Sequence, residues 1–145
     1  MYKRQALILS VAPGVLSANS IKFDFKDSKK VNNVVFLMDA PLESINGTAT
    51  GVSGTVSFDP AKPAATTGKI VLATSSLHVD NPLMKKHMLD EGWMHVSKFP
   101  TIEFVAVKMT NVKTSGTTII ATIAGKLTVK GITKKVSVPV RLTYL

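Results

Sequence analysis

Three histidines, His78, His87 and His95, are the side chains in this sequence best suited to metal chemistry. Three imidazoles that converge on one point, with a fourth position open to water, would form a zinc site. Sequence spacing alone does not bring these three together, and no acidic cluster accompanies them. We therefore predict no metal site, and we interpret His87 as a partner for backbone or for the polar end of a ligand. A metal protein or enzyme using His87 and His95 is the weakest of three hypotheses.

Carboxylates and hydroxyls offer no clearer catalytic set. Asp90 and Glu91 are adjacent, whereas acid–base catalysis needs two carboxylates held apart across a cleft with different pKa values. Ser75 and Ser76 lack the sharp turn and the base partner of a catalytic serine. No Gly-rich loop of the phosphate-binding kind is present. The sequence therefore predicts a protein that is not an enzyme and that uses no cofactor.

Length and composition indicate one folded domain. The chain has 145 residues, of which 45% are hydrophobic and 19% charged, and this balance excludes disorder. The absence of Cys excludes disulfides, thiolate-bound metals and thiol catalysis. Lys and Arg number 18 against 9 acidic residues, for a formal net charge of +9.

Residues 1–18 are typical of a secretory signal. The basic pair Lys3-Arg4 precedes a mostly apolar run over residues 6–16, and the small residues Ser17-Ala18 follow it. The run is too short for a membrane-spanning helix, which needs about 20 apolar residues. An ordinary N-terminal strand or helix is the alternative. We expect export, a periplasmic or secreted location, and a folded domain over residues 19–145.

Beyond the first 19 residues, apolar and polar residues alternate with a period of two, which predicts β-strands with one buried face. The alternation is clearest in residues 121–130, where odd positions are apolar, and in residues 136–144, where even positions are apolar. Pro139 on the outward face indicates an edge or closing strand, because proline cannot donate to a ladder. Short polar turns separate the strands and favour an antiparallel barrel or sandwich. The other strands are expected over residues 21–25, 34–40, 51–58, 69–77 and 101–112.

One segment departs from this period and predicts a short helix. Apolar residues recur at helical spacing over residues 83–88. Asn81 is suited to the N-cap, Pro82 to the first helical position, and Gly92 to the position just after the helix. We expect this helix to lie over the strands as a lid or plug.

Three stretches, residues 39–48, 87–104 and 125–136, carry a resemblance to a known family. In the second, a His-Met pair is followed by Trp-Met, a Val, then Lys-Phe-Pro-Thr and a strand ending in Phe. The third reads as a Gly-x-Leu-Thr strand, a Gly-Ile-Thr-Lys turn and a closing strand, although relatives often have His where this chain has Lys130. In order and spacing the chain resembles the YceI-like family. The resemblance implies an all-β fold, an antiparallel eight-stranded lipocalin-like barrel with one short inserted helix. It also implies a periplasmic protein that holds a polyisoprenoid, a quinone or polyprenyl phosphate, inside the barrel.

The predicted ligand site is a hydrophobic wall with polar ends. The inward faces are apolar, and each buried methylene contributes about 0.8 kcal/mol, so an isoprenoid could bind without polar contacts. The methionines suit an adaptable pocket, with core filling as the alternative. Lys85, Lys86 and His87 are the candidate polar ends, with solvated surface as the alternative for the two lysines. The wall residues are predicted to be Phe23, Phe36, Phe58, Leu72, Met84, Met88, Trp93, Phe104, Ile123, Leu127, Val138, Val140 and Leu142.

The basic excess suggests a second kind of partner. We expect Lys126 and Lys130 to point outward, and Lys134 and Lys135 to extend that basic stripe. Each Lys near an anionic membrane contributes about 1 kcal/mol of attraction, so we predict peripheral contact with such a surface, with a merely solvated face as the alternative. Nucleic acid is not expected, because only 6% of residues are aromatic and no RNA-binding signature is present. The oligomeric state stays open, a homodimer included. The alternative function is a periplasmic interaction or structural domain with a filled core and no lipid.

Overall fold

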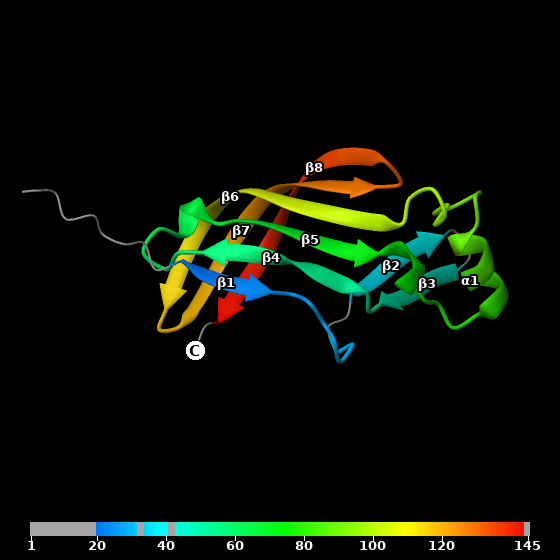
Figure 1. The fold of residues 1–145 in the computed structure, drawn as a ribbon, viewed down its shortest axis with the longest axis horizontal. Helices are drawn as coiled ribbons and strands as arrows, with labels where there is room; N and C mark the ends of the chain where they lie inside the picture. The colour runs from blue at the N-terminus through cyan, green and yellow to red at the C-terminus, as the bar shows by residue number, and fades with distance from the viewer. Residues whose placement is uncertain (1–19, 32–33, 41–42, 144–145) are drawn as a thin grey trace, which may run out of the picture.

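The computed structural model describes residues 20–31, 34–40 and 43–143, so the predicted signal over residues 1–18 lies outside the described residues. Within them the chain forms antiparallel strands, one α-helix and two short 3-10 helices (Figure 1). The elements in chain order are β1 (Ile21–Asp24), β2 (Val34–Ala40), β3 (Glu43–Ala49), β4 (Val52–Phe58), η1 (Pro63–Ala65), β5 (Thr67–Ala73), η2 (Thr74–Ser76), α1 (Pro82–Leu89), β6 (Thr101–Ser115), β7 (Thr118–Val129) and β8 (Ile132–Thr143).

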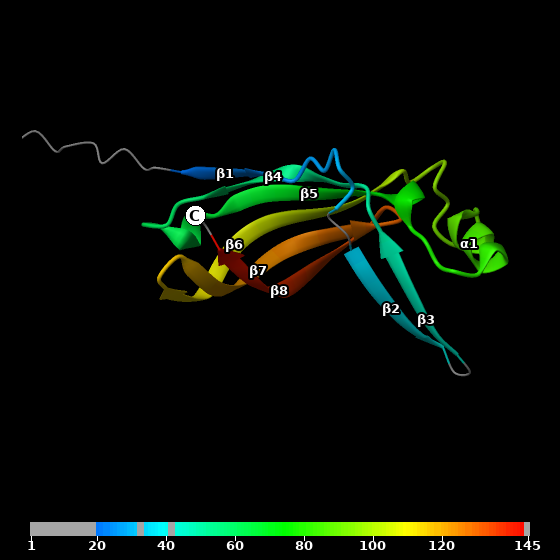
Figure 2. The ribbon, with the colours of Figure 1, turned by 90° about the horizontal axis from the view of Figure 1, so that it is seen from below.

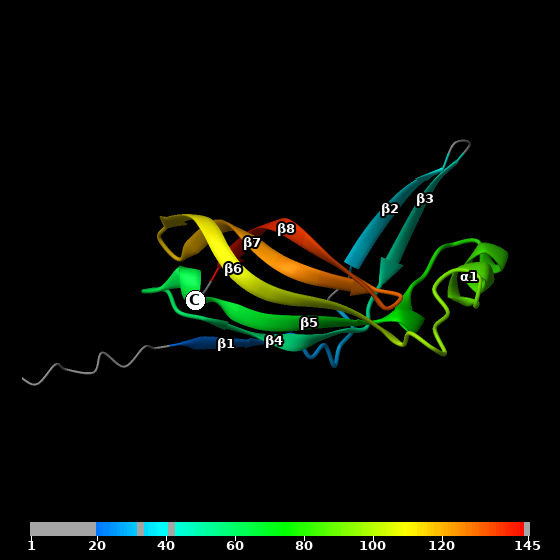
Figure 3. The same ribbon diagram turned by 90° about the horizontal axis from the view of Figure 1, so that it is seen from above.

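The strands form a main sheet and a separate hairpin. Six strands pair in the order β1-β4-β5-β6-β7-β8, and β2 pairs only with β3 among the described residues. Figure 2 shows the main sheet curved along its length, with the β2–β3 hairpin projecting from it at the end of the molecule where α1 lies. The β7–β8 turn points toward this same end of the molecule (Figure 3). The predicted alternation in β7 and β8 is confirmed, because inward Ile123 pairs with Val138 and inward Ala121 with Val140.

The fold is mostly β, as predicted, but a closed barrel is not seen in the described part of the chain. There, β1 and β8 are the two edges of the main sheet and do not pair with each other. The hairpin is hydrogen-bonded to the rest through the Thr48–His78 bridge, with N···O distances of 2.9 and 2.7 Å. The predicted barrel has eight strands, whereas among the described residues the main sheet has six and the other two form the separate hairpin. Pro139 lies on β8, which confirms the predicted edge position.

The helix begins where the sequence predicts and ends earlier. The Asn81 side-chain oxygen accepts hydrogen bonds from the backbone N–H groups of Leu83 and Met84, at 3.0 and 3.1 Å. The chain leaves the helix at Asp90, which has an extended backbone, so the prediction that Gly92 follows the last helical residue is wrong. The strand predicted over residues 69–77 likewise ends at Ala73, where η2 begins. No helix in the described ranges combines the length and apolarity that a membrane crossing requires.

Two hydrophobic clusters form the interior. One centres on Phe58, Met109 and Ile119, each at most 1% exposed, and fills the half of the sheet away from α1. The other, beneath α1, centres on Leu72, Leu77, Val79 and Met88 with Ala49 of β3. The first cluster leaves little room for a ligand, whereas the second is partly open.

The turn between β7 and β8 is fixed by its backbone and by a neighbouring ring. Lys130 and Gly131 have φ values of 49° and 74° and close a two-residue hairpin between Val129 and Ile132, as type I′ turns do. The Phe99 ring leaves no space for a side chain at Gly131, because a Cβ there would lie 2.9 Å from Phe99 Cε1.

Gly131→Ala is therefore expected to destabilise the protein more than Gly116→Ala. Both glycines have positive φ, which costs an alanine roughly 1–2 kcal/mol. Gly116 has no atom within 4 Å of its notional Cβ, so it reports the backbone cost alone. Urea unfolding of the two variants gives the difference, and equal losses would show that the Phe99 contact contributes nothing.

An ion pair joins β5 and β6 on the outer face. Lys69 Nζ lies 2.8 Å from Glu103 Oε2, and this hydrogen bond holds the pKa of Glu103 below its ordinary value of 4.5. A carboxylate with a lowered folded-state pKa stabilises the protein above its unfolded pKa, and the contribution is lost as the pH falls through the folded value. We expect Glu103→Gln to lower the urea midpoint slightly at pH 7, and the difference from wild type to shrink below pH 4.5. A difference that did not change with pH would contradict this assignment.

Candidate functional site

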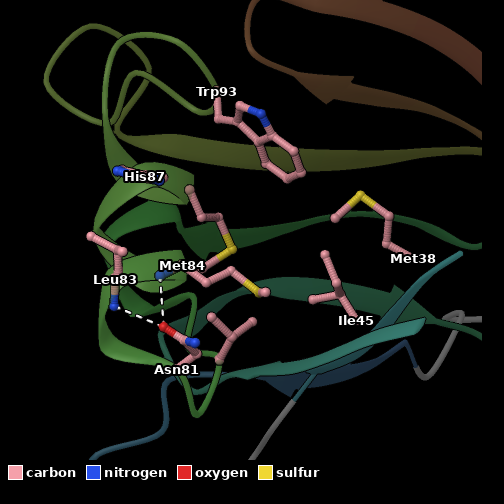
Figure 4. Close-up of a pocket in the computed structure, with 9 residues that line it drawn as sticks. Met38, Ile45, Asn81, Leu83, Met84, His87 and Trp93 are labelled. Carbon is pink, nitrogen blue, oxygen red and sulfur yellow. Dashed lines mark hydrogen bonds between the residues drawn. The ribbon is translucent and has the colours of Figure 1, made fainter. Parts of the chain in front are cut away.

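An apolar pocket lies between α1 and the β2–β3 hairpin (Figure 4). Its volume is about 360 Å³, at the lower end of the range for small-molecule sites. Met38 and Ile45 of the hairpin face Met84 of the helix, and Trp93 lies above them in the view. Asn81 and His87 are its polar side chains, and Asn81 already caps the helix. The full lining is Met38, Ile45, Val79, Asn81, Leu83, Met84, His87, Met88 and Trp93.

A second pocket of about 280 Å³ continues from the first, between the hairpin and the inner face of β5, β6 and β7. The two pockets share Met38, Met88 and Trp93. Its lining is entirely apolar: Val34, Phe36, Met38, Leu72, Leu77, Met88, Trp93, Met94, Ile102, Leu127 and Val129. Such a surface can hold a hydrocarbon but offers no group to react with it.

A third pocket of about 360 Å³ adjoins the second at the β7–β8 end. It shares Met94, Leu127 and Val129 with the second pocket. Its remaining lining is Lys130, Ile132, Lys134 and Val136. The three adjoining pockets are together named the apolar groove.

The period-two pattern and two glycines explain the groove's walls. Gly47 of β3 lies under the Phe36 ring, where a Cβ would come within 2.0 Å of Phe36 Cζ. Gly125 of β7 is covered by Phe104 in the same way, at 2.4 Å. Phe104 also packs against the filled cluster.

The structure brings part of the predicted site together in the groove. Seven of the predicted residues line it: Phe36, Leu72, Met84, His87, Met88, Trp93 and Leu127. Six lie in or against the filled cluster instead: Phe23, Phe58, Phe104, Ile123, Val140 and Leu142. The other three predicted residues do not line the groove. Val138 lies opposite Ile123 on β8. Lys85 Nζ is 3.1 Å from His78 Nδ1, and Lys86 is exposed.

Several lining residues were outside the predicted set. Met38 and Met94 belong to the methionine group for which the sequence favoured a pocket, whereas Met109 of that group lies in the filled cluster. Ile45 comes from a strand that the alternation did not reveal. Lys130 and Lys134 were predicted to belong to an outward stripe. That prediction is wrong for Lys134, because it pairs with inward Leu127, and for Lys130, which lies in the turn and lines the groove.

The three histidines lie in different surroundings. His78 is exposed, with Nε2 3.8 Å from Asp80 Oδ1, and His95 stacks edge-on against Phe99 at 5.9 Å between ring centroids. His87 lies at the groove's rim on α1. Among the described residues, no three His, Cys, Asp or Glu side chains are close enough to hold a metal ion.

A curved antiparallel sheet with one inserted helix defines the class of this protein as a small, mostly β, lipocalin-like fold. The chain belongs to the YceI-like domain family, whose match covers residues 19–144. It is 30% identical over 143 residues to a UPF0312 protein of Pseudomonas fluorescens, which covers 94% of this chain and 71% of that protein. It is 38% identical over 94 residues to a UPF0312 protein of Pseudomonas savastanoi, a match that covers 63% of this chain. The matched region is 46% of that relative, so this chain spans about half of the relative's length.

Solved structures show the same fold. BcnA of Burkholderia cenocepacia aligns with a TM-score of 0.57 at 25% identity, covering 74% of this chain and 63% of that one. The YCEI protein of Campylobacter jejuni aligns with a TM-score of 0.56 at 20% identity, covering 77% and 64%. The eight strands and single helix described above are therefore a YceI-like arrangement.

Proposed function

We propose that this protein binds, stores or carries an isoprenoid lipid, a quinone or polyprenyl phosphate, and catalyses no reaction on it. The observation that carries the proposal is the apolar groove, whose middle section has no polar lining side chain. Each buried methylene contributes about 0.8 kcal/mol, so a chain of a few isoprene units gains enough from burial to bind tightly. The family resemblance implies the same class of ligand.

The filled cluster limits where such a ligand fits. Under the alternative function, a domain with a filled core and no lipid, the whole interior would be packed. Among the described residues, only the half of the sheet around Phe58 and Met109 is packed in this way. The alternative does not account for the apolar groove, where Trp93 is 49% and Leu83 63% exposed. Large apolar side chains exposed around a concave apolar surface are typical of a binding site.

The proposal includes a periplasmic or secreted location and peripheral contact with an anionic membrane surface. The signal predicted over residues 1–18 and the net charge of +9 support it. The outer face of the main sheet adds Lys126 and Lys135, which are opposite each other in register. These cations would attract an anionic leaflet from which lipid is collected.

Trp93 supplies the test. It is the single tryptophan of the sequence and lines two of the three pockets. Titration with geranylgeraniol is expected to shift its emission to the blue and to saturate at one equivalent, because the ligand displaces water from the indole. Shorter alcohols, farnesol and geraniol, should bind progressively more weakly. If none of the three alcohols changes the emission or shows heat of binding by calorimetry, the proposed function is wrong.

A further inference from the structure

Two lysines lie at one end of the apolar groove. Lys130 is half-buried in the β7–β8 turn and Lys134 is exposed on β8, and both line the third pocket with Leu127 and Val129. Lys134 is opposite Leu127 in register, so it shares the inner face of the sheet with the groove's wall. Its neighbour Lys135 is opposite Lys126 on the outer face.

These two lysines have no acidic partner in the described ranges of the chain. The ion pairs found there join Lys69 to Glu103 and His78 to Asp80. An anion bound in the third pocket would therefore be stabilised by two positive charges that no carboxylate of the described residues neutralises. By contrast, Lys85, which was a predicted polar end, already contacts His78.

The backbone of Lys130 has an unusual conformation. Lys130 has a φ of 49°, a left-handed conformation that normally favours Gly, Asn or Asp in this kind of turn. The neighbouring Gly131 is packed against the Phe99 ring. Backbone strain of this kind clusters at functional sites, which agrees with a role for Lys130 beside the groove.

We propose that Lys130 and Lys134 bind the phosphate or pyrophosphate head group of the lipid whose chain occupies the apolar groove. This inference rests on the proposed function and narrows its ligand from isoprenoids in general to anionic ones. A phosphate carries several acceptor oxygens and between one and two negative charges, so two ammonium groups can bind it at once. An uncharged quinone head would leave both lysines without a partner.

The test compares three probes on three proteins. The probes are geranylgeranyl pyrophosphate, geranylgeraniol, which has the same chain without the charge, and inorganic pyrophosphate, which has the charge without the chain. The proteins are wild type, the inner variant Lys130→Gln/Lys134→Gln, and the outer variant Lys126→Gln/Lys135→Gln. Inner and outer variants lose the same charge from the same hairpin but from opposite faces, so the outer one is a matched control. Binding is followed by Trp93 emission and by calorimetry, and urea midpoints verify that both variants fold.

The inner variant is expected to bind geranylgeranyl pyrophosphate roughly 10-fold or more weakly, the size of one or two charge-assisted hydrogen bonds. Its affinity for geranylgeraniol should stay within about two-fold of wild type, because the chain contacts are untouched. The outer variant should bind both lipids within about two-fold of wild type, and inorganic pyrophosphate should bind wild type far more weakly than the lipid does.

Each other outcome overturns the inference in a different way. Equal losses in the inner and outer variants would show general attraction rather than a site. Equal losses for the two lipids would show that the lysines act on the chain. Inorganic pyrophosphate binding as tightly as the lipid would show a site for free anions. If wild type bound neither lipid, the proposed function itself would fail, which distinguishes that failure from one confined to head-group dependence.

Discussion

Replacing Leu127 with Trp is expected to weaken lipid binding strongly and leave the fold intact. Leu127 lies where the second and third pockets meet, and its side chain is only partly buried, so an indole can occupy the groove without displacing the core. Each methylene excluded from the groove costs about 0.8 kcal/mol, so the exclusion of about four weakens binding on the order of 100-fold. Calorimetry with geranylgeraniol measures the loss.

Ile120→Trp is the matched control for this variant. Ile120 is on the same strand but on the outer face, 50% exposed, and opposite Arg141. The Ile120→Trp variant should bind the lipid with wild-type affinity. Both tryptophan variants should have urea midpoints close to that of wild type. Wild-type affinity in Leu127→Trp would show that the chain does not pass through the groove.

Phe58→Ala is expected to produce the largest loss of stability among the residues that the sequence predicted as ligand wall. Phe58 is fully buried, 6.5 Å from Phe23 between ring centroids, in the filled cluster. Truncation of a buried Phe to Ala costs about 3–5 kcal/mol, because the lost contacts leave a cavity. The free energy of unfolding from urea denaturation gives this value directly.

Phe36→Ala is the comparison variant. Both phenylalanines were predicted as ligand wall, but Phe36 lines the groove whereas Phe58 lies in the filled cluster. The Phe36 ring is partly exposed already, so truncation should cost less stability than at Phe58 and weaken lipid binding more. If Phe58→Ala lost affinity for geranylgeraniol while keeping its stability, the ligand would occupy the end of the sheet that we describe as filled.

The sequence predicted the fold correctly where the alternation of neighbouring residues alone determines which face of a strand is buried, and where local capping residues start the helix. The alternation in residues 121–130 and 136–144 correctly predicted which face of β7 and β8 is apolar. The start of α1 was predictable because Asn81 and Pro82 act locally, through a cap and a fixed φ.

The hairpin and the division of the interior depend on contacts between distant residues. In β3, Ile45 is the one large apolar residue, and Gly47 is a poor strand former that is used here because the Phe36 ring lies across it. Inward-facing Ile123 and Leu127 have the same pattern in sequence, yet one is in the filled cluster and the other lines the groove. Periodicity identifies an inward face but not what lies opposite it.

The inward position of Lys134 could have been predicted. A two-residue turn at Lys130 and Gly131 pairs Val129 with Ile132, and counting back places Lys134 opposite inward Leu127. Because side chains alternate with a period of two, a one-residue difference in register exchanges the faces of the whole strand. The turn, rather than the lysine spacing, was the signal that determined this residue's role.

Native mass spectrometry of the protein purified after export to a bacterial periplasm, with extraction of whatever it carries, tests the central claim most directly. We predict one hydrophobic adduct per chain, with the mass of an isoprenoid, that is released by organic solvent and absent from the Leu127→Trp variant. A mass equal to the chain alone, unchanged after incubation with geranylgeraniol, geranylgeranyl pyrophosphate or a quinone, would contradict the claim that the groove is a lipid site.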